Sequence, residues 1–197
     1  LFVDYGGFRP LAEDEPGDID DEFLLAVWRD VKLLHDASIS HGTLTTQSIY
    51  NDGGRHLLGN FARGSVVADT ADKGQDVVGL LFSLSLLVGS DRAVKTAVEG
   101  AGRNAVEDAL PYLQLPAISR DGKKQADNPK DTMKELRATV AEATNLELPE
   151  PVKLRRVTGR DILTAGLLLF ALGALVPMLA GIDFDELVWR ILETSFG

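Results

Sequence analysis

Apolar residues form one long run near the end of the chain, from Ile162 to Ile182. The run is 21 residues long and carries no charged side chain. A helix of about 20 apolar residues spans the hydrocarbon core of a bilayer. A membrane helix also tolerates an internal proline such as Pro177, which a soluble helix resists. The pattern therefore predicts a transmembrane helix over residues 161–182, and the alternative is a helix buried in a soluble core.

The residues on either side of this run differ in charge. Basic residues precede it and acidic residues follow it, namely Lys153, Arg155, Arg156 and Arg160 before, and Asp183, Asp185 and Glu186 after. Because cationic residues are retained on the cytoplasmic side of a membrane, we expect residues 1–159 to face the cytoplasm. After the span, apolar residues recur at helical spacing, which predicts an amphipathic helix over residues 183–197.

Shorter patterns predict a mainly helical domain with a small β-hairpin in the first part of the chain. Apolar residues recur at helical spacing over Asp21–Asp36 and predict a helix with Asp20 or Asp21 as its N-cap. The turn sequence Asn51-Asp52-Gly53-Gly54 lies between two apolar runs and predicts a hairpin. Further elements are expected as a strand at Leu1–Tyr5, a buried helix at Val77–Val88, a helix at Ala93–Tyr112 and a short amphipathic helix at Asp131–Ala143.

The composition argues against several classes of function. A net charge of −10 argues against nucleic-acid binding, which needs a basic face. The chain has no cysteine, which excludes disulfides and thiolate chemistry, and its three histidines lack the spacing of a zinc hydrolase. Acidic residues are concentrated between Glu13 and Glu22. Such a cluster predicts a solvated loop, with a metal site or a site for a basic partner as the alternatives.

One stretch in the middle of the chain carries the residues most suggestive of chemistry. It reads His41-Gly42-Thr43-Leu44-Thr45-Thr46-Gln47-Ser48-Ile49, followed by the predicted hairpin and by Leu58-Gly59-Asn60-Phe61-Ala62. This order resembles the catalytic core of protein-kinase-like enzymes, in which the pattern H-x-D-L-x-x-x-x-N precedes two short strands and D-F-G. The resemblance covers residues 1–116, and it implies a protein-kinase-like C-lobe there.

Three positions depart from the kinase pattern, and the departures imply a pseudokinase. Thr43 stands in place of the catalytic aspartate, Ser48 in place of the magnesium-binding asparagine, and Asn60 in place of the aspartate of D-F-G. None of the three offers the anionic oxygen that a general base or a magnesium ion needs. We therefore expect no intact catalytic residue, no metal and no cofactor. Weak or metal-independent nucleotide binding stays open, and no nucleotide-binding residue is assigned.

The resemblance gives two further residues structural roles. His41 is expected to bond backbone carbonyls rather than to act as a catalyst. Asp76 is expected to hold the backbone of the loop by accepting its N–H groups, because a buried carboxylate needs such donors.

The segment that follows the lobe resembles a second family. Residues 117–160 read as a polar linker with a short amphipathic helix and a basic flank. The stretch Lys153–Trp189 resembles the first part of the membrane region of lysylphosphatidylglycerol synthase or flippase-like proteins. Together the resemblances imply a larger integral protein of the bacterial plasma membrane that handles lipid or cell-envelope precursors. Its kinase-like domain would be cytoplasmic, non-catalytic, and regulatory or scaffolding; a pseudokinase carried by a lipid II flippase is a second family with this arrangement.

Two other functions stay open. One is an atypical active kinase or small-molecule phosphotransferase, and the other is a soluble helical interaction module whose apolar run is core. The expected partners are the lipid bilayer and a cytoplasmic protein, with no nucleic acid.

Overall fold

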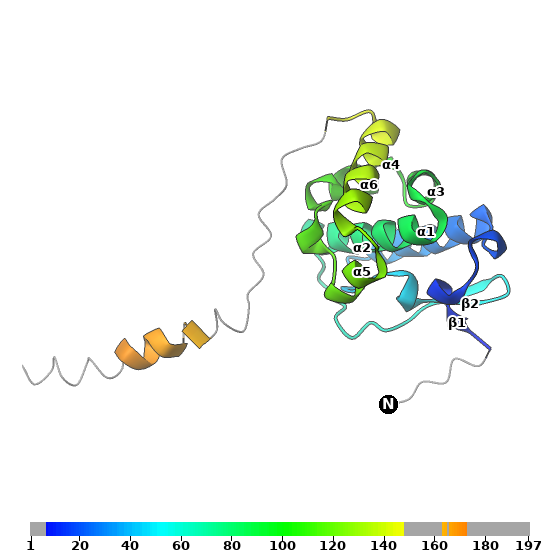
Figure 1. Cartoon of the computed structure of the whole chain (residues 1–197). Helices are drawn as coiled ribbons and strands as arrows, with labels where there is room; N and C mark the ends of the chain where they lie inside the picture. Colours follow the sequence, from blue (N-terminus) through cyan, green and yellow to red (C-terminus); the bar gives the residue numbers. More distant parts are fainter. Residues whose placement is uncertain (1–6, 148–162, 165, 173–197) are drawn as a thin grey trace, which may run out of the picture. The chain divides into compact units, whose positions relative to one another are not determined.

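The computed structural model describes residues 7–147, 163, 164 and 166–172 (Figure 1). The chain divides into two compact units, Leu1–Leu154 and Arg155–Gly197. The first unit is mainly helical and carries a small antiparallel sheet. In the second unit, the described residues are helical and exposed.

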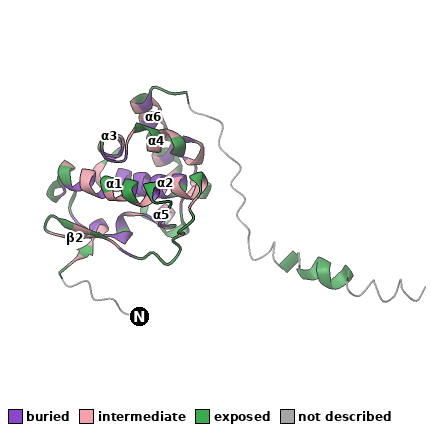
Figure 2. Cartoon of the chain, turned by 180° about the vertical axis from the view of Figure 1, so that it is seen from behind, coloured by how far each residue is buried: buried purple, intermediate pink, exposed green. Residues whose placement is uncertain are grey.

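The core of the first unit forms around the central helix α2 (Thr70–Val88). Almost every residue of α2 from Asp76 to Ser85 is buried, so this helix needs neighbours on all sides. The helices α3 (Ser90–Gly100), α4 (Arg103–Ala109) and α6 (Pro129–Thr144) pack on α2, and α3 also packs on α1 (Asp21–Asp36). Figure 2 shows the buried residues gathered along these helices. The short helix α5 (Arg120–Gln125) also belongs to this unit. 3-10 turns lie at Leu11–Glu13, Pro16–Asp18, Thr46–Ser48, Leu110–Tyr112 and Leu115–Ala117.

The sheet has three antiparallel strands in the order β1 (Arg9–Pro10), β2 (Ile49–Asp52) and β3 (Arg55–Leu58). The predicted hairpin is β2 and β3, joined by Gly53 and Gly54, which have φ angles of 63° and 121°. Glycine adopts such positive angles without steric cost, which explains the turn sequence. The strand β1 was not predicted because it has only two residues and ends at a proline. The strand expected at Leu1–Tyr5 lies outside the described residues.

Two helical predictions need correction. The helix expected over Ala93–Tyr112 is divided into α3 and α4, because Gly102 takes a φ of 96° between them and ends the helical path. The stretch of residues 117–160, predicted to be a polar linker with one short helix, also contains α5, whose N-cap Ser119 accepts a hydrogen bond from Gly122 N at 3.0 Å. By contrast, α1 has the predicted bounds, and Asp20 is its N-cap, accepting from Phe23 N at 2.6 Å.

The acidic cluster is only in part the solvated loop that was predicted. The Asp14 side chain is 1% exposed; its Oδ1 lies 2.7 Å from Arg9 Nε, and its Oδ2 accepts from Asn51 Nδ2 at 2.6 Å. Arg9 and Asn51 are paired across β1 and β2, so this carboxylate holds the edge of the sheet. Glu13, Glu15 and Asp18 are exposed, as expected of a solvated loop.

Asp21 ties the same segment to α3. Its carboxylate lies 2.6 Å from Arg92 Nε and 3.4 Å from Lys95 Nζ. The hydrogen bond from Arg92, with a smaller contribution from Lys95, holds the pKa of Asp21 below its ordinary value. The start of α1 is therefore fixed to α3 by charge as well as by apolar packing.

The predicted transmembrane helix over residues 161–182 is wrong for the part of the chain that can be examined. Among residues 7–147, 163–164 and 166–172, no helix combines the length and the apolar character needed to cross a bilayer. Most of Ile162–Ile182 lies outside the described residues, as does the amphipathic helix expected over residues 183–197. The prediction used the length of an uncharged sequence, whereas the helical residues that the structure describes within it, 163, 164 and 166–172, are too few to cross a bilayer. What stands of the predicted fold class is a mainly helical domain, with a three-stranded antiparallel sheet in place of a lone hairpin.

Asp21→Asn should lower the melting temperature at neutral pH, because the variant loses its ion pairs with Arg92 and Lys95. The pKa of Asp21 is lower in the folded than in the unfolded chain, so the pairs stabilise the fold above about pH 4 and the effect is lost as pH falls through the folded pKa. Thermal unfolding followed from neutral pH to about pH 2 should show the two proteins converging. Glu15→Gln, at an exposed acidic position, is the control and should match the wild type; a difference for Asp21→Asn that persists in acid would contradict the ion-pair account.

Candidate functional site

The loop that follows α1 lies along one face of α2 and is held there by three residues of that helix. Asp76 accepts hydrogen bonds from His41 N at 2.5 Å and from Gly42 N at 2.8 Å. At Gly79, a Cβ atom would lie 2.6 Å from the carbonyl oxygen of Leu44, so only glycine lets the loop approach. Ser83 Oγ accepts from Thr46 N at 3.0 Å.

These three residues are spaced by three and four positions, so they share one face of the helix. The sequence prediction included Asp76 but missed Gly79 and Ser83. The signal was present as a small or polar residue at each of these positions within an otherwise apolar helix. Such positions in a buried helix mark the face that contacts backbone rather than side chains.

His41 uses both ring nitrogens inside the fold. Its Nε2 lies 2.7 Å from the carbonyl oxygen of Gly59, which can only accept, so Nε2 carries the proton. Its Nδ1 then accepts from Thr43 N at 3.3 Å. The ring also lies against Phe61, with 4.4 Å between centroids. The side chain links the loop to the end of β3 and has no nitrogen left for a substrate.

The three positions that depart from the kinase pattern differ in burial and in their contacts. Ser48 is buried, and its Oγ both donates to Thr45 O at 2.8 Å and accepts from Thr45 N at 3.0 Å. Thr43 is half-buried, while Asn60 is exposed with a φ of 64°. No hydrogen bond joins the side chains of Thr43, Ser48 and Asn60 to one another in the described part of the chain. Within those same residues, no group of three or more histidine or carboxylate side chains could hold a metal ion.

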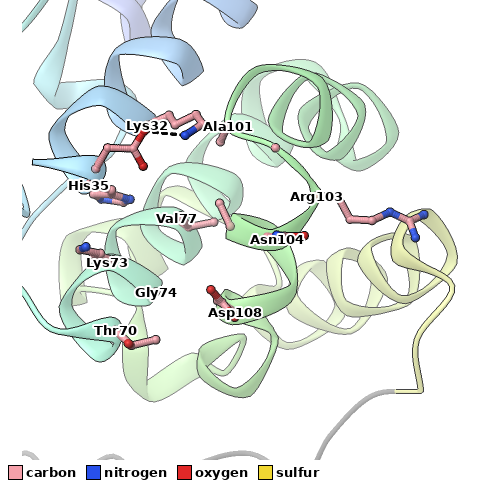
Figure 3. Close-up of a pocket in the computed structure, with 13 residues that line it drawn as sticks. Lys32, His35, Thr70, Lys73, Gly74, Val77, Ala101, Arg103, Asn104 and Asp108 are labelled. Carbon is pink, nitrogen blue, oxygen red and sulfur yellow. Dashed lines mark hydrogen bonds and ion pairs between the residues drawn. The ribbon is translucent and has the colours of Figure 1, made fainter. Parts of the chain in front are cut away.

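A cleft of about 560 Å³ opens beside this loop, between the end of α1, the start of α2 and the α3–α4 connection (Figure 3). His35 lies in its wall and also within 3.4 Å of Asp76 Oδ2, measured from Nε2, so the cleft adjoins the carboxylate that holds the loop. Its apolar lining comes from small residues, namely Gly74, Val77, Ala101, Gly102 and Ala105. Its polar lining consists of Lys32, Asp36, Thr70, Lys73, Arg103, Asn104 and Asp108.

The charged residues of the cleft differ in how far they are already neutralised. Lys32 Nζ lies 2.6 Å from Asp36 Oδ2. Arg103 donates to Ala143 O at 3.0 Å and lies 3.9 Å from Glu107. The side chains of Lys73 and Asp108 make no hydrogen bond or ion pair with any described residue. The sequence prediction included none of these residues, because helices distant along the chain create the cleft.

The comparisons with known proteins identify no family for this chain. No protein-family model matches it, and a search of the curated proteins gives no match. The predicted pseudokinase C-lobe and the flippase-like or lysylphosphatidylglycerol synthase-like membrane region are therefore wrong as identifications. The resemblance used the order of altered motifs, none of them intact. The contacts of His41 and Asp76 do not restore it, since a buried imidazole or carboxylate accepts or donates such backbone hydrogen bonds in many folds.

Asp76→Ala should destabilise the fold by about 1–3 kcal/mol, because the N–H groups of His41 and Gly42 lose their acceptor. Asp76→Asn should also destabilise the fold, because the NH₂ group of asparagine cannot accept a hydrogen bond from the N–H group of His41 or Gly42 that it would face. Urea denaturation at neutral pH measures both effects. The control is Asp121→Ala at an exposed pair in α5, which should change stability by less than about 0.5 kcal/mol. Equal stability of the wild type and both Asp76 variants would contradict the assigned contact.

Proposed function

We propose that this chain acts as a non-catalytic binding module with a regulatory or scaffolding role, and that the cleft beside His35 is its binding site. The observation that carries the proposal is a contrast between two neighbouring places. The polar groups of the loop are engaged in holding the fold, whereas the cleft has open volume and charged groups without partners.

The state of the loop supports a non-catalytic role. A general base needs a lone pair within reach of the proton that it removes. His41 uses its one free lone pair on Thr43 N, and Asp76 directs one oxygen to each of two backbone N–H groups. The hydroxyl of Ser48 is engaged within its own turn. Using any of these groups in a reaction would break contacts that position the loop.

The composition of the cleft supports binding. Sites for small molecules typically enclose roughly 300–1,000 Å³, with an apolar lining and a few convergent polar groups. This cleft, of about 560 Å³, lies in that range, and buried residues such as Val77 and Ala101 provide its apolar lining. Three helices of the same packed unit, α1, α2 and α4, supply its walls.

The position of His35 supports a regulatory role. Its ring lines the cleft, and its Nε2 lies 3.4 Å from the carboxylate that holds His41 and Gly42. A ligand that shifts this ring would change the surroundings of Asp76 and so the loop at the surface of the domain. The protein partner expected from the sequence stays a prediction. The loop would be the surface that such a partner contacts.

The test is a titration of the ¹⁵N-labelled chain with a set of small acidic, basic and neutral fragments, followed by amide chemical shifts. Fragments that bind should shift the amides of residues 73–77 and 101–105. Ala105→Phe, which adds a ring at the cleft wall, should abolish these shifts. Ala138→Phe, at an exposed alanine on α6, is the matched control and should preserve them.

Two results would contradict the proposal. One is the absence of any fragment that shifts the cleft amides. The other is turnover of a substrate, such as a nucleotide with magnesium, that His41→Ala abolishes while the variant stays folded.

A further inference from the structure

We infer that the ligand of the cleft is a small organic anion, whose apolar body packs on the wall at Gly102 and Ala105 and whose acidic group pairs with Lys73. This inference rests on the proposed function, since it assumes that the cleft is the binding site. Its first support is the state of Lys73 itself. The side chain lies in the second turn of α2, is half-buried, and lines the cleft (Figure 3). It makes no ion pair or hydrogen bond with any described residue.

The Lys73 side chain is half-buried, and its charge has no partner among the described residues. Partial burial of a charged side chain without a partner is unfavourable. The chain also has 30 acidic residues against 20 basic ones, so carboxylates were abundant enough to supply one. A ligand that brings its own anionic group would satisfy Lys73 and gain from a site that is already partly desolvated.

The other cations of the cleft are less available to a ligand. Lys32 is neutralised by Asp36 one turn away on α1. The guanidinium of Arg103 is occupied by the carbonyl oxygen of Ala143, with Glu107 beside it. An acidic group that enters the cleft would therefore find its strongest attraction at Lys73.

Asp108 limits the charge that the ligand can carry. It lines the same cleft and has no partner among the described residues, but it is exposed and therefore hydrated, so it does not need a counter-charge as Lys73 does. Its negative charge disfavours a polyanion in the cleft. A single acidic group at the Lys73 side, kept away from Asp108, is the arrangement that these charges favour.

The size of the cleft and its apolar lining define the rest of the ligand. The alanine and glycine residues there line a volume of about 560 Å³, which is enough for a body of one to three rings. A matched pair of fluorescent probes fits this description. 8-Anilinonaphthalene-1-sulfonate carries one anionic group, and N-phenyl-1-naphthylamine has the same rings without it.

The experiment titrates the full chain with each probe and locates binding by the amide shifts of residues 73–77 and 101–105. Lys73→Gln should lower the affinity for the sulfonate probe about fivefold and leave the affinity for the neutral probe unchanged. Asp108→Asn should raise the affinity for the sulfonate probe about twofold. A variant that was merely destabilised would not bind the probe more tightly. Lys134→Gln, an exposed lysine on α6, is the matched control and should leave both affinities unchanged.

Two results would overturn the inference, and they differ in what they say of the proposed function. If both probes shift the cleft amides and Lys73→Gln changes neither affinity, the anion preference is wrong and the binding module stands. If neither probe nor any fragment shifts those amides in the folded wild type, the cleft is not a binding site and both proposals fall.

Discussion

The structure of the first unit depends on one contact, the carboxylate of Asp76 receiving the backbone N–H groups of His41 and Gly42. Burying a carboxylate costs free energy unless strong donors compensate it, and burying backbone N–H groups carries the same requirement. Each side of this contact satisfies the other. With the neighbouring contacts at Gly79 and Ser83, it fixes the loop along α2.

The same contact links the loop at His41 to the cleft at His35. On one side, His41 continues from the loop to the carbonyl oxygen of Gly59 at the end of β3. On the other, His35 lies between Asp76 and the cleft. The polar groups of the loop are therefore used in holding the fold, whereas the side chain of Lys73 in the cleft has no partner among the described residues. This difference favours binding over catalysis and suggests how an occupied cleft could be sensed at the surface.

The sequence predicted what depends on local pattern. Helical spacing and the N-cap Asp20 located α1, and the turn at Gly53-Gly54 located the hairpin. It failed where tertiary contacts decide. Asp14 and Asp21 looked like members of a solvated loop, yet Asp14 lies beside Arg9 of β1, and Asp21 pairs with Arg92, which is distant in sequence. The cleft could not be predicted because the packing of three helices creates it, and the kinase resemblance failed because motif order without intact motifs specifies little.

Hydrogen exchange at the amides of His41 and Gly42 tests the central contact most directly. Both N–H groups lie in a loop outside any helix or strand, so without their acceptor they would exchange quickly, as exposed loop amides do. If Asp76 holds them as described, they should be protected to the same extent as the buried amides of α2, and Asp76→Asn should release them while α2 stays protected. Rapid exchange of both amides in the wild type would contradict the account.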